Sequence, residues 1–265
     1  IGVTGVQTCA LPISYSLLGV APIDGVEAEI LLDGYIERGP AAGLVLNLSS
    51  LGGTSGAGRF DAYGLYDLGG VDRTSAGRNV TIDRGLRGQA VGEYRANLSA
   101  DLYLEAQLAY ISDETWITAW RQADYNARRQ YETSFYLDYS PDNTALSFLG
   151  RTELNDFLSN GYVIASQPYF VEKLPELDYD REGDDLGGVA TWSSIWRVSS
   201  MSLQVTEGSA DSLGVRDPTF AVADGARPVR TLYEDAGYAD GTVNRFFTRQ
   251  EFAFPLDGKG WTASP

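Results

Sequence analysis

Asp101-Leu-Tyr-Leu-Glu-Ala-Gln-Leu-Ala-Tyr110 alternates apolar and polar side chains almost without a break. Its even-numbered positions are aliphatic or aromatic, and its odd-numbered positions include Glu105 and Gln107. A period of two places successive side chains on opposite faces of a β-strand. The stretch therefore predicts a strand with one apolar face and one polar face.

The same alternation recurs along most of the 265-residue chain. It predicts strands at 26–36, 41–50, 59–67, 86–98, 102–112, 130–139, 144–156, 173–182, 188–206 and 243–255. Residues 99–101 and 140–143 form tight turns between strands, whereas the connections 68–85, 112–129 and 207–242 are long and polar. Strands of about ten residues with alternately short and long connections are typical of transmembrane β-barrels. The sequence therefore predicts an all-β fold: an antiparallel transmembrane β-barrel fragment of about ten to eleven strands, cut at both ends.

The connection 112–129 is the one that shows a helical pattern. Ser112 or Asp113 is suited to cap a helix, and Trp116 and Trp120 lie one helical turn apart. One short loop helix is therefore expected. Two interpretations of its tryptophans stay open: packing onto neighbouring loops, or anchoring at a membrane interface.

The alternation also assigns side chains to the two faces of a barrel wall, polar toward the lumen and apolar toward lipid. The lumen-facing set is predicted to be Glu105, Gln107, Glu132, Asp138, Arg151 and Glu153. The lipid-facing set is predicted to be Leu104, Leu108, Phe135, Leu137, Phe148 and Leu154.

The composition narrows the classes of partner. The formal net charge is −16, with 36 acidic and 20 basic residues. Nucleic-acid binding depends on clustered Lys and Arg, so no nucleic-acid partner is expected. The chain has no apolar run of about 18 residues, which argues against a transmembrane helix but leaves a barrel span open.

The sequence has little of the chemistry that enzymes use. It contains no histidine, which excludes Ser–His and Cys–His nucleophiles and histidine-ligated zinc within this chain. The glycine-rich run 52–58 lacks the spacing of a phosphate-binding or dinucleotide-binding loop. Neither an enzyme activity nor a cofactor is expected.

An acidic stretch beginning at Asp178 partly imitates a calcium-binding loop. Asp180 and Glu182 follow at the expected spacing, and Gly183 stands at the sixth position. The twelfth position is Val189, where such loops carry a bidentate Glu. A solvated acidic turn is therefore favoured over a metal site.

The first 14 residues differ in character from the rest. The segment Val3-Thr-Gly-Val-Gln-Thr-Cys-Ala-Leu-Pro-Ile13 reads as the in-frame translation of a common sequencing adapter, and it contains Cys9, the one cysteine of the chain. We interpret residues 1–14 as a library artefact and residues 15–265 as the partial barrel domain. A remnant of a signal peptide is the rival interpretation, but the segment has neither a basic start nor a continuous apolar run.

Several short strings, in the same order, resemble the LptD family of outer-membrane lipopolysaccharide-assembly proteins. The strings are Asp33-Gly-Tyr-Ile-Glu-Arg-Gly-Pro40, Tyr66-Asp-Leu-Gly-Gly-Val-Asp-Arg73, Arg84-Gly-Leu-Arg87, Tyr110-Ile-Ser-Asp113, Asn143-Thr-Ala145, Asn155-Asp-Phe157, Lys173-Leu-Pro-Glu-Leu177, Arg245, Glu251-Phe-Ala-Phe-Pro-Leu256 and Trp261-Thr-Ala-Ser-Pro265. The resemblance covers roughly residues 30–265, and its weight lies in the order of the strings.

The resemblance implies an integral protein of the outer membrane of a Gram-negative-type cell. Its partners would be lipopolysaccharide, outer-membrane lipid, an LptE-like plug lipoprotein and the periplasmic Lpt bridge proteins. The chain departs from the family because it lacks the N-terminal jelly-roll and the last strands, and the family's inter-domain cysteines are absent. The expected function is insertion of lipopolysaccharide into the outer leaflet.

Two other classes remain as alternatives. One is a different outer-membrane barrel, such as a porin or an uptake channel. The other is a soluble, secreted β-sandwich that binds a ligand, in which the aliphatic rows would pack against a second layer.

Overall fold

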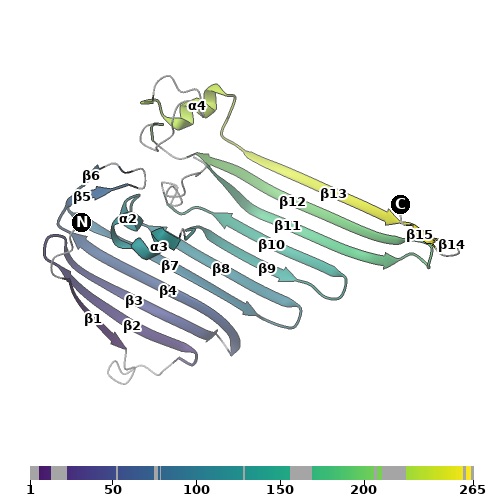
Figure 1. Ribbon diagram of the computed structural model, residues 1–265, viewed down its shortest axis with the longest axis horizontal. Helices are drawn as coiled ribbons and strands as arrows, with labels where there is room; N and C mark the ends of the chain where they lie inside the picture. Colours follow the sequence, from purple (N-terminus) through teal and green to yellow (C-terminus); the bar gives the residue numbers. More distant parts are fainter. Residues whose placement is uncertain are drawn as a thin grey trace.

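The computed structural model describes residues 6–12, 23–51, 53–74, 77, 79–127, 129–155, 169–205, 208–210, 225–258 and 261–263. The chain is mostly antiparallel β-structure, which confirms the all-β prediction (Figure 1). One sheet contains eleven strands, which follow one another in chain order. These strands are β1 (Val6–Pro12), β2 (Val26–Tyr35), β3 (Gly39–Leu51), β4 (Thr54–Asp67), β7 (Gly85–Asn97), β8 (Leu102–Ile111), β9 (Thr133–Tyr139), β10 (Thr144–Thr152), β11 (Tyr169–Asp185), β12 (Thr191–Val205) and β13 (Thr242–Ala253).

Two small hairpins lie outside the large sheet. One is formed by β5 (Gly70–Arg73) and β6 (Asn79–Ile82), inside the connection predicted to be a long polar loop. The other is formed by β14 (Leu256–Gly258) and β15 (Trp261–Ala263). In the second hairpin Trp261 is paired with Gly258.

The lengths of the connections divide the sheet into two ends. At the turn end, β3–β4, β7–β8, β9–β10 and β11–β12 are joined by five residues or fewer. At the loop end, β2–β3 has a short turn, whereas β4–β7, β8–β9, β10–β11 and β12–β13 have long connections. From β3 to β13 the predicted alternation of short and long connections is therefore present, with the short ones together at one end (Figure 1).

The helices exceed the single one expected. The connection after β8 contains two, α2 (Trp116–Trp120) and α3 (Gln122–Ala127). A further helix, α4 (Val229–Asp235), begins after Pro228 in the connection between β12 and β13. The prediction missed α4 because Gly, Asp and Pro dominate that connection. Its helical signal is the i, i+3, i+4 spacing of Val229, Leu232 and Tyr233, which pack together.

A glycine-rich segment that was expected to be a loop is largely strand. Residues 54–58 pair within β4, whereas the loop was predicted to cover 51–58. Tyr94 explains the glycines, because its side chain fills the space that a Cβ atom at Gly56 or Gly58 would need. Glycine here gives room to a cross-strand aromatic ring rather than breaking the strand.

Each strand of the large sheet has two unlike faces. On one face, directly paired residues form an apolar line across six strands: Leu104, Leu137, Phe148, Leu177, Val198 and Phe246. We call this side the apolar face and the opposite side the polar face. The larger hydrophobic core lies on the polar face near the loop end, where Trp116 and Ile117 of α2 pack over Leu65 and Val91. A smaller core lies under α4, against Leu203 and Val205 of β12.

Candidate functional site: the polar face and its loop end

The strand pairing brings four of the six predicted polar-face residues onto one side of the sheet. Gln107 pairs with Ser134, which pairs with Arg151. Glu105 and Asp138 share that face because they alternate with Leu104 and Leu137 on the same strands. Glu132 and Glu153 lie just outside the strands. Strand alternation therefore does not fix their direction.

The two remaining residues are placed by specific contacts. Glu132 forms an ion pair with Arg151, with 2.7 Å between its Oε2 and Nη2 of the arginine. Glu153 is buried and accepts a hydrogen bond from Nδ2 of Asn155 at 2.5 Å. Asn155 Oδ1 in turn accepts from the backbone N–H of Ile111 at 2.8 Å. Glu132 thus joins the polar face, whereas Glu153 belongs to a buried cluster at the loop end.

Five of the six residues predicted to face lipid lie together on the apolar face. Leu104, Leu137 and Phe148 are directly paired in one line. Phe135 and Leu108 continue the alternation of β9 and β8 and are exposed. Leu154 follows the end of β10 and is 47% exposed, so its direction is not set by strand alternation.

The polar face carries arginines that the sequence prediction did not include. Arg59, Arg95 and Arg245 all lie on it, and all three are exposed. Within the described part of the chain, none of the three has a carboxylate oxygen within 4 Å. The same alternation could have revealed them, because each stands at a polar-face position of its strand.

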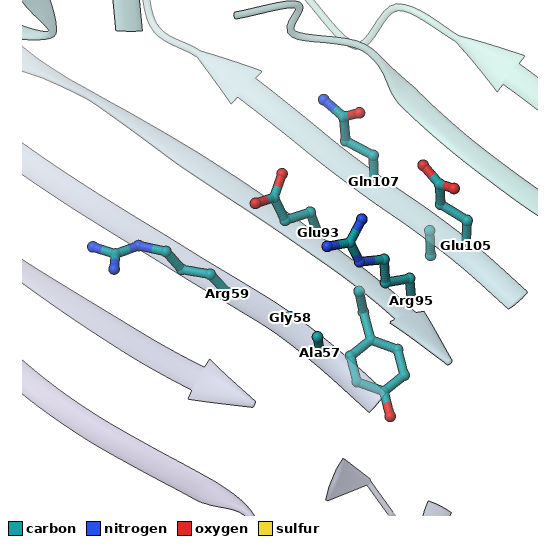
Figure 2. Close-up of a pocket in the computed structure, with 9 residues that line it drawn as sticks. Ala57, Gly58, Arg59, Glu93, Arg95, Glu105 and Gln107 are labelled. Atoms are coloured by element: carbon teal, nitrogen blue, oxygen red, sulfur yellow. The ribbon is translucent and has the colours of Figure 1, made fainter. Parts of the chain in front are cut away.

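A depression of about 330 Å³ lies on the turn-end half of this face (Figure 2). Arg59, Glu93 and Gln107 line it from one row of paired residues, on β4, β7 and β8. Arg95 and Glu105 line it from the next row toward the turn end. Figure 2 shows these five side chains standing on the same side of three neighbouring strands. The depression offers both signs of charge to a polar ligand.

At the loop end, five charged side chains and a threonine form a buried ion cluster: Arg38, Asp67, Asp72, Arg87, Asp113 and Thr115. Arg38 donates to Asp67 Oδ2 and to Asp72 Oδ1, both at 2.6 Å. Arg87 donates from Nη1 to the same two carboxylates, at 2.7 and 2.8 Å. The side chains of Asp67 and Asp72 are completely buried.

Arg87 also joins the cluster to the helix-bearing connection. Its Nε and Nη2 donate to the two oxygens of Asp113 at 2.8 and 2.7 Å, and Nη2 donates to Thr115 Oγ1 at 2.9 Å. Burial by itself would raise the pKa of the Asp113 carboxyl. Hydrogen bonds and the positive charge of Arg87 outweigh burial and lower that pKa below its ordinary value.

The ion cluster fastens three loop-end connections to the sheet. Arg38 lies in the β2–β3 turn, Asp72 in the β5–β6 hairpin, and Asp113 and Thr115 before α2. Trp116 reinforces this arrangement: it is fully buried, donates from Nε1 to Gln89 Oε1 at 3.0 Å and stacks on Trp120. Both tryptophans therefore contact the protein itself, mainly side chains on strands of the sheet rather than neighbouring loops.

The cluster brings together the strings that carry the family resemblance. Arg38, Asp67, Asp72, Arg87 and Asp113 come from four of those strings, and all five meet at one point. Sequence reasoning quoted these residues without foreseeing the contact. The signal was present as charged residues that stand at or near the ends of strands.

The acidic stretch that begins at Asp178 shows no cation site. In the described segments, no three residues of the Asp, Glu, Cys or His types are grouped so that they could hold a metal ion. Asp178 accepts a hydrogen bond from Arg197. Asp184 accepts from Arg181 and Asn143.

A scan against models of protein families finds no match, and a search of curated proteins finds none either. Among the described residues, no helix has the length and apolar character needed to cross a membrane.

Proposed function

We propose that the chain is part of an outer-membrane β-barrel that inserts lipopolysaccharide into the outer leaflet. The observation that carries this proposal is a sheet one strand thick whose exposed side chains are apolar on one face and charged on the other. On the apolar face, Val198 and Phe246 are 50% and 62% exposed. A soluble β-sandwich would bury such rows under a second sheet, whereas lipid is the solvent that suits them.

The arrangement of the connections supports the same proposal. Short turns at one end and long connections at the other are the pattern of outer-membrane barrels. The open sheet described here would be one part of the barrel wall. The polar face would line the lumen, with the helices and the β5–β6 hairpin over its loop end.

The chemistry of the polar face suits an anionic amphiphile. Lipopolysaccharide carries negatively charged sugar-phosphates, and Arg59, Arg95 and Arg245 offer guanidinium groups with no carboxylate within 4 Å in the described segments. These arginines offset part of the net negative charge of the chain at the place where the polar half of the lipid would pass. Transport of this kind breaks no covalent bond, so it needs no catalytic residue.

Photo-crosslinking in a lipopolysaccharide-producing host tests the proposal. A benzoylphenylalanine at Glu105 or Gln107 should form adducts with lipopolysaccharide in transit. The matched positions Leu104 and Leu108 should form adducts with membrane lipid. Adducts to lipid on the apolar face without lipopolysaccharide on the polar face would favour a porin or uptake channel. A chain extracted without detergent, with no lipid adducts, would contradict any membrane barrel.

A further inference from the structure

A continuous line of paired residues crosses eight strands on the apolar face. It runs through Gly56, Ala96, Leu104, Leu137, Phe148, Leu177, Val198 and Phe246, from β4 to β13. We call it the pairing line. Because paired residues stand directly opposite one another, the line is perpendicular to the strands. It gives a common origin from which positions on different strands can be compared.

The pairing line crosses different strands at different positions along their length. On β4 it passes through Gly56, close to the first residue of the strand at the turn end. On β12 it passes through Val198, the middle of a strand that spans Thr191–Val205. Figure 1 shows the same stagger, since the turn ends move steadily to the right from β4 to β12.

The apolar side chains do not follow the pairing line. On β4, the apolar face continues from the line toward the loop end through Phe60 and Ala62 as far as Tyr66. On β12, the positions toward the loop end become polar at once. The apolar residues of β12 lie on the other side of the line, at Trp196 and Trp192.

The polar positions near β12 form a connected patch on the otherwise apolar face. Glu172 of β11 accepts hydrogen bonds from Ser202 Oγ at 2.7 Å, from Gln204 Nε2 at 3.3 Å and from Thr152 Oγ1. Ser200, paired with Asn244, extends it toward the pairing line. We call these residues the Glu172 patch. An ionised carboxylate in hydrocarbon would be costly, so this part of the face is suited to water or to lipid headgroups.

The distance of the apolar band from the pairing line changes from strand to strand, and this change gives the tilt that the strands would have relative to a bilayer. The centre of the band lies at Ala62 in β4, six residues from the pairing line toward the loop end. In β12 it lies midway between Trp192 and Val198, three residues from the line toward the turn end. These strands are separated by six steps across the sheet. With about 3.3 Å per residue along a strand and about 4.8 Å between strands, the band crosses the pairing line at about 45°. Strands of membrane barrels tilt by a similar angle.

We propose that a lipid bilayer crosses the apolar face obliquely, with the Glu172 patch in its headgroup layer on the loop side. Residues at the same height on β4 and β8 then contact acyl chains. Trp192 lies at the opposite interface, where amphipathic rings are favoured. The inference rests on the proposed membrane location. It assigns a depth in the bilayer to individual residues of the apolar face.

Three positions at equal height above the pairing line give a direct test. Phe60, Leu108 and Ser202 each lie four residues toward the loop end on β4, β8 and β12. Each is changed to cysteine in a Cys9→Ser background, spin-labelled and inserted into phosphatidylcholine vesicles. Collision rates with oxygen and with a water-soluble nickel chelate report the depth. Gln107→Cys, beside Leu108 but on the polar face, is the control.

An oblique bilayer predicts a several-fold lower oxygen-to-nickel ratio at residue 202 than at 60 and 108. In cells, a membrane-impermeant maleimide should modify the cysteine at 202 and spare the other two. Equally high ratios at all three positions would overturn the inference while leaving a membrane location intact. Ratios as low as that of the control at all three positions would overturn the membrane proposal as well.

Discussion

The two halves of the sheet use charge in opposite ways. In β2–β8, the residues of the ion cluster are largely buried at the loop end, next to the hydrophobic core that contains Trp116. In β9–β13, pairs such as Arg197–Asp178 lie on the surface of the sheet, with Arg197 41% exposed. The first half therefore resembles the interior of a folded domain, whereas the second resembles a wall in contact with water. Substitution of the same residue type should consequently change the free energy of unfolding by very different amounts in the two halves.

The largest expected difference concerns matched arginines on β7 and β12. Arg87→Gln removes one of the two arginines that the buried Asp67 and Asp72 share, and also the arginine partner of Asp113, which should lower the free energy of unfolding by about 3–5 kcal/mol. Arg197→Gln should cost about 1 kcal/mol or less, because its ion pair is partly exposed to water. Urea unfolding in detergent micelles measures both. Similar losses in the two variants would show that the ion cluster is not a buried structural centre.

The next largest effect separates the two faces of one strand. Leu137→Arg places a charge on the apolar face and should destabilise the inserted protein by about 2–4 kcal/mol. Its neighbour Asp138 lies on the polar face, and Asp138→Arg should change the stability by less than about 1 kcal/mol. Heat-modified mobility on gels reports the folded fraction of each variant in membranes. Equal impairment by both would mean that the apolar face does not contact lipid.

A smaller effect is expected in acid at Asp113 of the ion cluster. The pKa of Asp113 is lower in the folded chain than its ordinary value of 3.8. The ionised form therefore stabilises the fold above about pH 4, and this contribution is lost as the pH falls through the folded pKa. Stability measured between pH 6 and pH 3 should fall at the acid end. In Asp113→Asn this part of the slope should be reduced, and an unchanged slope would assign the acid sensitivity to other carboxylates.

The smallest effect is predicted at the edge strand β13. Arg249 pairs with Glu251 two residues away, and both side chains are more than half exposed. Arg249→Gln should change the free energy of unfolding by less than about 0.5 kcal/mol. The same urea titration checks this value. A loss approaching that of Arg87→Gln would show that β13 is covered by a partner under the conditions of measurement.

The sequence predicted the strands better than the connections, for a physical reason. A period of two is a local property, so segments such as 102–112 and 243–255 could be assigned without knowledge of the fold. The β5–β6 hairpin and α4 depend on contacts with distant residues, and their composition resembles a loop. The ion cluster was hidden for the same reason, because Arg87 meets Asp113 26 residues away and Asp67 20 residues away.

The face assignments show the limit of periodicity at the strand ends. Glu105 and Leu104 lie on opposite faces of the sheet because they are successive residues of one strand, as the pattern indicated. Glu153 and Leu154 lie beyond the point where β10 ends at Thr152, and there the pattern no longer determines direction. The predicted face assignments cover three strands only and so omit the arginines of the polar face, although the alternation of β4 and β7 contains Arg59 and Arg95.

The order of the strands has a consequence for how such a wall is built. The strands of the large sheet lie side by side in the order in which they occur along the chain. Assembly can thus advance by adding one hairpin at a time to an existing edge, and no segment has to thread between two strands that have already joined. Contacts that are close in sequence form fastest, so each newly exposed edge would wait only briefly for its next neighbour.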